Sequence, residues 1–517
     1  MKPQAPPTAT SPTLTRRIGR VACAAAAAQA VGELVSLAQT VALARLLSPS
    51  VVGLFVAGTV LSAFLSNFVE GGLRSGLVHR EDRLDDAADT VFYATLGSGV
   101  LMTVGALALS PLIGIVFHSA TAGYVAAASS GTLLLFSLTN VPEALLQRRF
   151  SVTRRIVVGP AVAVSFAATA VTLAALGAGV WSMVAGSYVS YVVWVIAVWT
   201  ICRWRPGRGH PSVRLWREHA RYGYPLVLGM VGARVQTLAQ SVFVGRGLSD
   251  AALGWFRYAS RISQAPVTAL IEVGSVSLFP AFSRIAHDHT RFRAGYLRAL
   301  TLSVFGGAAM SGLLIAAGEP AVVVAFGEPW RGAGTALVAM AGMGLGKAFT
   351  CVSEEAIKGG GRTGLLNWYT LVETVLSIAL LVALIRPLGV VGAGLSVSIT
   401  AVVVGMVCVV LARPVVGFVF REVVTASAAP IAAAVVATVA VGTLEHMVFR
   451  SDTHALPVAL SLLALDLVAF CTIDLIVFAA LAPSTARRIV VRFLDRARRS
   501  GGLETTEEAG LTTGASD

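Results

Sequence analysis

Long apolar stretches separated by short polar segments dominate the chain. An α-helix needs about 20 apolar residues to cross a bilayer, and we count fourteen stretches of that kind. The short connections leave no room for a folded domain on either side. The pattern therefore predicts an all-α polytopic membrane protein with about 14 transmembrane helices. The fourteen stretches are residues 18–47, 50–72, 89–117, 122–147, 156–178, 180–202, 222–247, 251–279, 297–326, 332–357, 363–385, 388–412, 424–449 and 456–482.

Composition agrees with this class. Only 13% of the 517 residues are charged and the mean hydropathy is +0.76, whereas soluble domains carry about 25% charged residues. Residues 16–47 resemble a signal peptide at their start, but the apolar run is too long for one. The net charge of +13 does not indicate a nucleic-acid partner, because the basic residues form short clusters between apolar runs.

The basic clusters predict the orientation. If the N-terminus is cytoplasmic, the inner segments hold 31 Lys and Arg residues and the outer segments hold 5. Such an excess marks the cytoplasmic side. We therefore expect both termini in the cytoplasm.

The chain also contains an internal repeat. Residues 38–55 and 239–256 share eight of eighteen positions at an offset of 201 residues. Six predicted helices separate the copies, an even number, so both copies have the same orientation. A weaker echo joins 176–179 with 388–392. We expect two pseudo-symmetric six-helix lobes plus a C-terminal helix pair.

These patterns divide the chain into six segments. A basic segment at 281–298 with interleaved aromatic residues is either a surface that lies on anionic lipid or an ordinary loop. The expected segments are a disordered cytoplasmic N-tail (1–15), an N-lobe of helices 1–6 (16–202), a basic cytoplasmic linker (203–221), a C-lobe of helices 7–12 (222–413), helices 13–14 (414–483), and a tail that is basic and amphipathic, then disordered (484–517).

Four cations lie within predicted membrane helices: Arg234, Arg257, Arg261 and Lys347. A charge at the bilayer centre costs at least about 2.5–3.5 kcal/mol, so such residues face a cavity or a partner. Arg257 and Arg261 share a helix face at i, i+4. Because guanidinium groups bind phosphate oxygens bidentately, one interpretation is a cationic lumen for a pyrophosphate.

The other interpretation is that these cations pair with buried carboxylates and only lock helices together. Glu33 is a candidate partner, because it occupies the repeat position that corresponds to Arg234. Glu373 is a further mid-membrane acid, either a proton site or a structural partner. For Asp466 and Asp474 in the last helix we expect a structural role.

Nothing in the sequence indicates a cofactor. The five cysteines are far apart, without metal-ligand spacing. No Walker motif is present, and the short outer loops do not favour an enzyme. We therefore expect no metal site, no cofactor and no catalytic residue.

Several motifs resemble a known family. They are Glu70–Arg80 (EGGLRSGLVHR), Pro142–Arg148 (PEALLQR), Gly177–Trp181 (GAGVW), Ser277–Arg284 (SLFPAFSR) and Phe326–Trp330 (FGEPW). Together they are similar to the polysaccharide-transporter, O-antigen flippase-like branch of the multidrug/oligosaccharidyl-lipid/polysaccharide (MOP) exporter superfamily. The resemblance covers roughly residues 15–415.

This resemblance implies a MATE-like, two-lobed transporter of the bacterial cytoplasmic membrane. Its substrate would be a polyprenyl-pyrophosphate-linked oligosaccharide, flipped outward by alternating access for cell-surface polysaccharide synthesis. Membrane lipids, and glycosyltransferases and a polymerase of the same pathway, are the implied partners. Arg261 falls where relatives carry an arginine, whereas Gln240 stands where they often carry an acid, which leaves the coupling ion open. The alternatives are a cation-coupled drug antiporter of the same fold and, less favoured, a membrane glycosyltransferase or polymerase.

Overall fold

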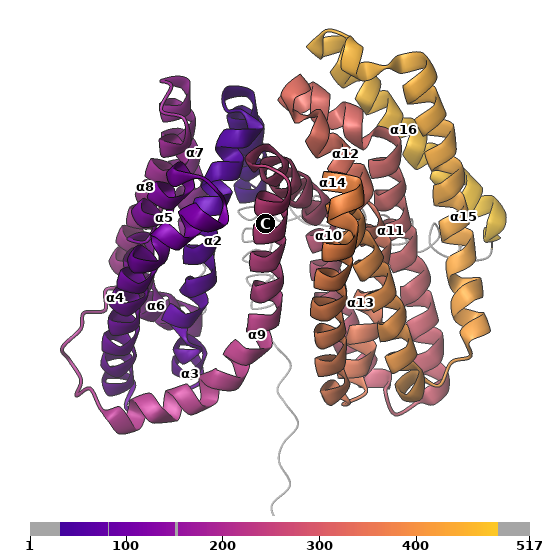
Figure 1. Ribbon diagram of the computed structural model, residues 1–517. Coiled ribbons are helices and arrows are strands. Elements are labelled where there is room, and N and C mark those ends of the chain that lie inside the picture. Colours follow the sequence, from indigo (N-terminus) through magenta and orange to yellow (C-terminus); the bar gives the residue numbers. More distant parts are fainter. Residues whose placement is uncertain (1–30, 81, 150–153, 484–517) are drawn as a thin grey trace, which may run out of the picture. The chain divides into compact units, whose positions relative to one another are not determined.

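The computed structural model describes residues 31–80, 82–149 and 154–483, and every regular element in these ranges is a helix (Figure 1). An unlabelled helix covers 31–46. The labelled α-helices are α2 (Pro49–Glu70), α3 (Leu73–His79), α4 (Leu84–Val116), α5 (Ala120–Ser129), α6 (Thr132–Arg148), α7 (Gly159–Ala175), α8 (Val180–Cys202), α9 (Val213–Gly247), α10 (Asp250–Ile285), α11 (His289–Phe326), α12 (Arg331–Met340), α13 (Gly342–Gly359), α14 (Leu366–Val416), α15 (Phe420–Leu444) and α16 (Leu456–Leu481).

The structure confirms an all-α, multi-pass membrane protein. Within the described ranges, ten helical stretches are long and apolar enough to cross a membrane. Eleven of the fourteen predicted stretches coincide with them, since 363–385 and 388–412 both lie in the stretch Thr363–Val416. The predicted stretches 222–247 and 251–279 lie in α9 and α10, which are not among the ten. The number fourteen therefore stays a prediction.

The internal repeat is visible as a symmetric helix crossing. α2 begins at Pro49 and α10 at Asp250, which are 201 residues apart like the repeat itself. A Cβ placed on Gly53 would lie 1.7 Å from the Asp250 carbonyl oxygen, and one on Gly254 would lie 2.1 Å from the Pro49 carbonyl oxygen. Each glycine thus packs against the first residue of the other copy's helix. Only a residue without a side chain allows this approach.

The weaker echo has a structural counterpart as well. Gly179 precedes α8 with φ 55° and ψ −131°, and Gly389 interrupts α14 with φ 58° and ψ −134°. This backbone conformation is essentially restricted to glycine. The conformational match pairs Gly389 with Gly179, and it explains why each apolar run changes direction at that point.

The helices form two compact units, each with its own apolar core. Unit 1 comprises Met1–Arg261, Ala325–Ala336 and Thr370–Ser396, and unit 2 comprises Ile262–Val324, Leu337–Tyr369 and Val397–Asp517. In unit 1, Leu77, Val91 and Trp204 belong to one buried cluster. In unit 2, Phe282 and Phe418 belong to another.

The basic segment 281–298 is not an ordinary loop, and its contact with anionic lipid stays a prediction. It forms the end of α10 and the beginning of α11. Phe282, Phe292 and Tyr296 are at most 2% exposed and pack in the unit 2 core. Tyr296 also hydrogen-bonds Ser353 at 3.0 Å. The aromatic residues therefore hold α10, α11 and α13 together, and their arginine neighbours remain at the surface.

Candidate functional site

Three of the predicted cationic residues lie in unit 1. Arg234 is on α9, and Arg257 and Arg261 are one turn apart on α10. All three are exposed in the structure. Within the described part of the chain, none of them forms an ion pair with a carboxylate. Their charges are therefore not neutralised by a carboxylate of the described residues.

Arg261 is held by the helix that carries Glu33. Its guanidinium group donates to the Ser36 hydroxyl and, at 3.4 Å, to the Ser36 carbonyl oxygen. Glu33 lies about one turn before Ser36 on the helix 31–46 and is exposed. Among the described residues, Glu33 makes no ion pair with Arg234 or Arg261. Ser36, which no sequence pattern singles out, is thus the residue that orients Arg261.

Gln240 faces α14, not the arginines. Gly232, Gln236 and Gln240 follow one another at intervals of four residues along one side of α9. Both glutamine side chains donate to the Ser377 hydroxyl, Gln236 at 2.8 Å and Gln240 at 3.4 Å. Glu373 is one turn before Ser377 on α14 and half-buried.

Arg234 points to another side of α9. It is two residues from Gly232, which places it about 200° around the helix from the stripe that packs against α14. Arg234 and Gln240 therefore do not share a face of α9. The structure assigns Gln240 to helix packing and leaves Arg234 on the exposed side.

Lys347 lies in unit 2, on α13. Its side chain is half-buried and makes contacts of its own within the structure. The preceding Gly346 packs closely on α14, since a Cβ there would lie 2.3 Å from the Ala401 carbonyl carbon. Lys347 thus belongs to a different unit from the three arginines.

The FGEPW motif joins both copies of the repeat. The Trp330 indole donates to the Ala44 carbonyl oxygen at 2.8 Å, and the Trp330 ring stacks on Tyr258 with centroids 4.5 Å apart. The Trp255 indole donates to the Pro329 carbonyl oxygen at 3.0 Å. The motif thus fixes the start of α10, and with it the position of Arg257 and Arg261.

Two other motifs contact each other. Arg74, from EGGLRSGLVHR, donates to the Gln147 side chain at 3.2 Å and pairs with Glu143 at 3.5 Å. Glu143 and Gln147 belong to PEALLQR, and Glu143 also accepts a hydrogen bond from the Trp194 indole at 2.9 Å. These motifs link α3, α6 and α8 and hold the scaffold of unit 1 together.

The basic linker is fastened to the N-terminus of α4. The Asp89 carboxylate accepts the backbone N–H of Gly207 at 3.0 Å and that of Gly209 at 2.7 Å. The backbone N–H of His210 donates to Asp86 at 2.8 Å. Carboxylates in the first turn also favour the positive end of the helix dipole. The linker is therefore anchored by its backbone, and its arginine side chains remain at the surface.

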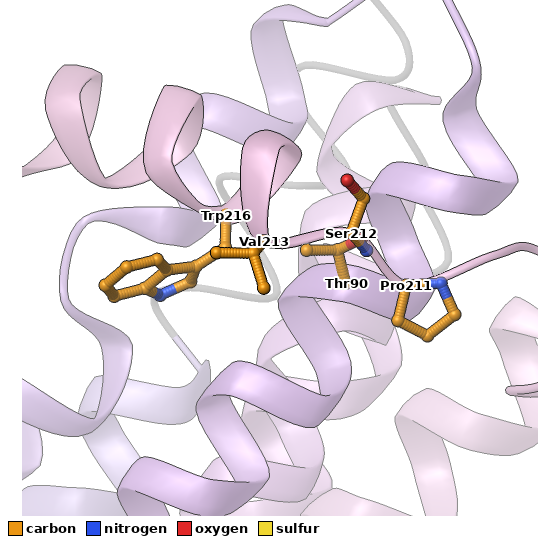
Figure 2. A pocket seen from close by; sticks show the side chains of 5 residues that line it. All are labelled: Thr90, Pro211, Ser212, Val213 and Trp216. Carbon is orange, nitrogen blue, oxygen red and sulfur yellow. The ribbon is translucent and has the colours of Figure 1, made fainter.

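The same segment borders a small cavity. Figure 2 shows Thr90, Pro211, Ser212, Val213 and Trp216 around it. Its volume is about 200 Å³, which is below the usual 300–1,000 Å³ of a ligand pocket, and no charged side chain lines it. It does not suit a pyrophosphate. In the described part of the chain, no group of three His, Cys, Asp or Glu side chains could hold a metal ion.

The sequence is similar to proteins of a known family. The family described as polysaccharide biosynthesis protein matches residues 42–334. The succinoglycan biosynthesis transport protein ExoT of Rhizobium meliloti (strain 1021) is 28% identical over 341 residues, which cover 64% of this chain and 67% of that protein. The lipopolysaccharide biosynthesis protein WzxC of Escherichia coli (strain K12) is 23% identical over 304 residues, 57% of this chain and 60% of that protein. The aligned regions thus span about two thirds or less of these relatives.

Solved structures share the fold. The lipid II flippase MurJ in an inward closed conformation superposes with a TM-score of 0.70 at 14% identity, covering 90% of this chain and 99% of that one. An inward-facing multidrug resistance MATE family transporter of the MOP superfamily gives 0.61 at 17% identity, covering 75% and 94%. Because the family match extends over more than half of the chain, the protein belongs to the polysaccharide biosynthesis protein family.

Proposed function

We propose that this protein is a flippase that moves a polyprenyl-pyrophosphate-linked oligosaccharide from the inner to the outer leaflet by alternating access. The observation that carries the proposal is the set of exposed arginines on α9 and α10, Arg234, Arg257 and Arg261, which have no carboxylate partner among the described residues. The names of two relatives, a succinoglycan transport protein and a lipopolysaccharide biosynthesis protein, support it.

The chemistry of a lipid-linked diphosphate fits these residues. Guanidinium groups bind phosphate oxygens bidentately and keep their charge at any physiological pH. Arg261 is oriented by Ser36, so less side-chain freedom is lost when it binds. Lys347 on α13 is a further cation for which we propose a substrate-binding role. A sugar head group needs polar surroundings, while the lipid tail can stay in the bilayer.

The membrane potential can drive this transport without a cofactor. An anion that leaves a cell with a negative interior gains about 2.3 kcal/mol per charge per 100 mV. A coupled proton or sodium ion would add to this, and Glu33 and Glu373 are the acids that we propose for such a role. Gln240, by contrast, has no titratable group.

The proposal extends to architecture and location. We place the protein in the bacterial cytoplasmic membrane with both termini in the cytoplasm. The proposed segments are two six-helix lobes, 16–202 and 222–413, joined by the linker 203–221, and an added helix pair, 414–483. Glycosyltransferases and a polymerase of the same pathway are the proposed partners. The protein itself carries out transport and no covalent chemistry.

The antiporter alternative predicts a different set of charges. A site for cationic drugs needs acidic side chains, whereas α9 and α10 expose arginines. The likeness to MATE transporters is one of fold, at 17% identity. We therefore propose an anionic substrate.

Reconstitution tests the proposal. Purified protein in proteoliposomes is given a fluorescent polyprenyl-pyrophosphate sugar, and the fraction reaching the outer leaflet is followed by quenching or enzymatic capture. A hydrogen bond to a charged group contributes about 1.5–3 kcal/mol, so Arg234→Ala and Arg261→Ala are each expected to lower the initial rate roughly tenfold or more. The double variant should be slower still.

Arg246→Ala is the matched control, because Arg246 is an exposed arginine at the far end of the same helix as Arg234. We expect it to leave flipping unchanged. Flipping at the wild-type rate in the Arg234→Ala, Arg261→Ala double variant would remove the proposed binding role. Transport of a cationic dye, with no transport of the labelled lipid, would support the antiporter.

A further inference from the structure

The hairpin of α15 and α16 buries carboxyl groups for which the proposed transport needs no role. The π-helical turn η4 (Glu445–Phe449) follows α15, and the 3₁₀ turn η5 (Ser451–Thr453) precedes α16. Glu445 is 1% exposed, and Asp466, ten residues into α16, is 0% exposed. The side chains of Asp466 and Glu445 are in contact. Both belong to unit 2.

The hydrogen bonds of the two groups differ. Glu445 accepts the backbone N–H of Ser451 and the Ser451 hydroxyl, both at 2.8 Å. Both of its carboxyl oxygens therefore have a hydrogen-bond donor. Neither oxygen of Asp466 has a hydrogen-bond partner. Since two ionised carboxylates have no proton to donate, their contact becomes a hydrogen bond only when one of them is protonated.

No cation in the described part of the chain neutralises this pair. The elements packed against it are α15 with η4, η5, and α11, which meets Phe470 of α16 through Ala316. None of their charged or titratable side chains forms an ion pair with Asp466 or Glu445. These side chains are His446 on η4, Arg450, Asp452 and His454 around η5, Glu319 on α11, and Asp474 on α16.

Two adjacent buried anions without a counterion are not a stable arrangement. Burial disfavours each charged form, and the second charge repels the first, so carboxyl pairs of this kind share one proton. The cost of ionisation is higher within a membrane helix than at a soluble surface. A proton on Asp466 removes one charge and supplies the missing hydrogen bond in a single step.

We propose that Asp466 and Glu445 form a proton-binding pair, in which the Asp466 hydroxyl donates to the Glu445 carboxylate. The proton joins η4 to α16 and closes the hairpin around Ser451, which is 0% exposed. Asp474 is not part of the pair: it lies two turns further along α16, with the buried Phe470 between them. Loss of the proton would leave two buried anions and loosen α15 from α16.

Infrared difference spectroscopy of the full-length protein in lipid nanodiscs tests this directly. The spectrum of wild type minus Asp466→Asn at neutral pH is expected to contain the C=O stretch of a protonated carboxyl group, which shifts in D₂O. Glu445→Gln should shift that band, because the hydrogen-bond partner changes. Asp474→Asn is the matched control and should leave the band in place. A difference spectrum that shows only an ionised carboxylate at Asp466 would overturn the proposal.

Stability against pH gives a second readout that does not depend on transport. In wild type the carboxyl pair loses its proton as the pH rises, whereas in Asp466→Asn the amide that replaces Asp466 has no proton to lose. The thermal half-life of wild type relative to Asp466→Asn should therefore fall as the pH is raised from about 5 to 9. If Asp466→Asn does not fold, Glu445→Gln replaces it in the same comparison. A constant ratio over this range would contradict the proposal, whether or not the protein flips lipid-linked sugars.

Discussion

The symmetric crossing of α2 and α10 gives a sharp prediction for Gly254→Ala. The added Cβ would lie 2.1 Å from the Pro49 carbonyl oxygen and 3.0 Å from its carbonyl carbon. Both are backbone atoms at the first residue of α2. Unlike the end of a flexible side chain, they cannot turn away. Relief therefore requires that the two helices separate.

The size of the effect follows from these distances. An ordinary contact begins near 3.4 Å, so the methyl group is about 1.3 Å too close to the oxygen, on the steep repulsive side of the potential. Overpacking of this kind costs about 1–3 kcal/mol. Alanine gains about 0.5–1 kcal/mol over glycine as a helix former. We expect a net destabilisation of roughly 1–2 kcal/mol.

Gly97→Ala measures the effect of helix propensity on stability without a steric clash. Gly97 lies inside α4 and is exposed, and a Cβ added there would have no neighbouring atom within 4 Å. This variant should be as stable as wild type or more stable. Thermal unfolding in detergent, read by intrinsic fluorescence, then gives a lower midpoint for Gly254→Ala than for Gly97→Ala, and the difference isolates the steric cost.

Gly53→Ala extends the experiment across the repeat. Its Cβ would lie 1.7 Å from the Asp250 carbonyl oxygen at the same crossing. Once one substitution has separated the helices, the second has less to displace, so the double variant should lose less than the sum of the single losses. Equal midpoints for Gly254→Ala and Gly97→Ala, or strictly additive losses, would refute the symmetric crossing.

Two predictions concern the basic linker and the helix ends around it. Asp89→Ala removes the acceptor of the Gly207 and Gly209 N–H groups, so trypsin should cleave after Arg208 severalfold faster than in Asp85→Ala, an exposed neighbour; equal cleavage would contradict the anchoring role. The hydrogen bond from Arg80 lowers the pKa of Glu218 below its usual range, against a smaller opposing effect of desolvation. The pair therefore stabilises the folded state fully above the ordinary glutamate pKa of about 4.3. This stabilisation is lost as the pH falls through the lowered pKa. Glu218→Gln should therefore have a lower thermal unfolding midpoint than wild type at neutral pH and the wild-type midpoint in acid, and a difference that persists in acid would argue against the pair.

Much of the fold could be predicted because bilayer-spanning helices leave a strong pattern. Runs of about 20 apolar residues are long enough to cross a bilayer, and the runs found in the sequence coincide with most of the observed helices. α9 and α10 are harder to predict from the sequence, because Arg234, Arg257 and Arg261 interrupt their apolar runs.

The contacts of the candidate site were less accessible from sequence. Ser36 and Ser377 carry no motif, yet one orients Arg261 and the other binds Gln240. The acidic nature of Asp466 was visible, but its pairing with Glu445 requires the hairpin to bring residues 21 positions apart into contact.

The sequence by itself determined the class of protein and the existence of a repeat, because hydropathy and self-similarity are properties of the chain alone. Only the tertiary structure decided how the two copies of the repeat pack on each other and which polar groups are in contact. Gly53 and Gly254 lie where α2 and α10 cross, and Asp466 is half of a carboxyl pair. Neither follows from the sequence, since the burial and the contacts of a side chain depend on which helices pack together.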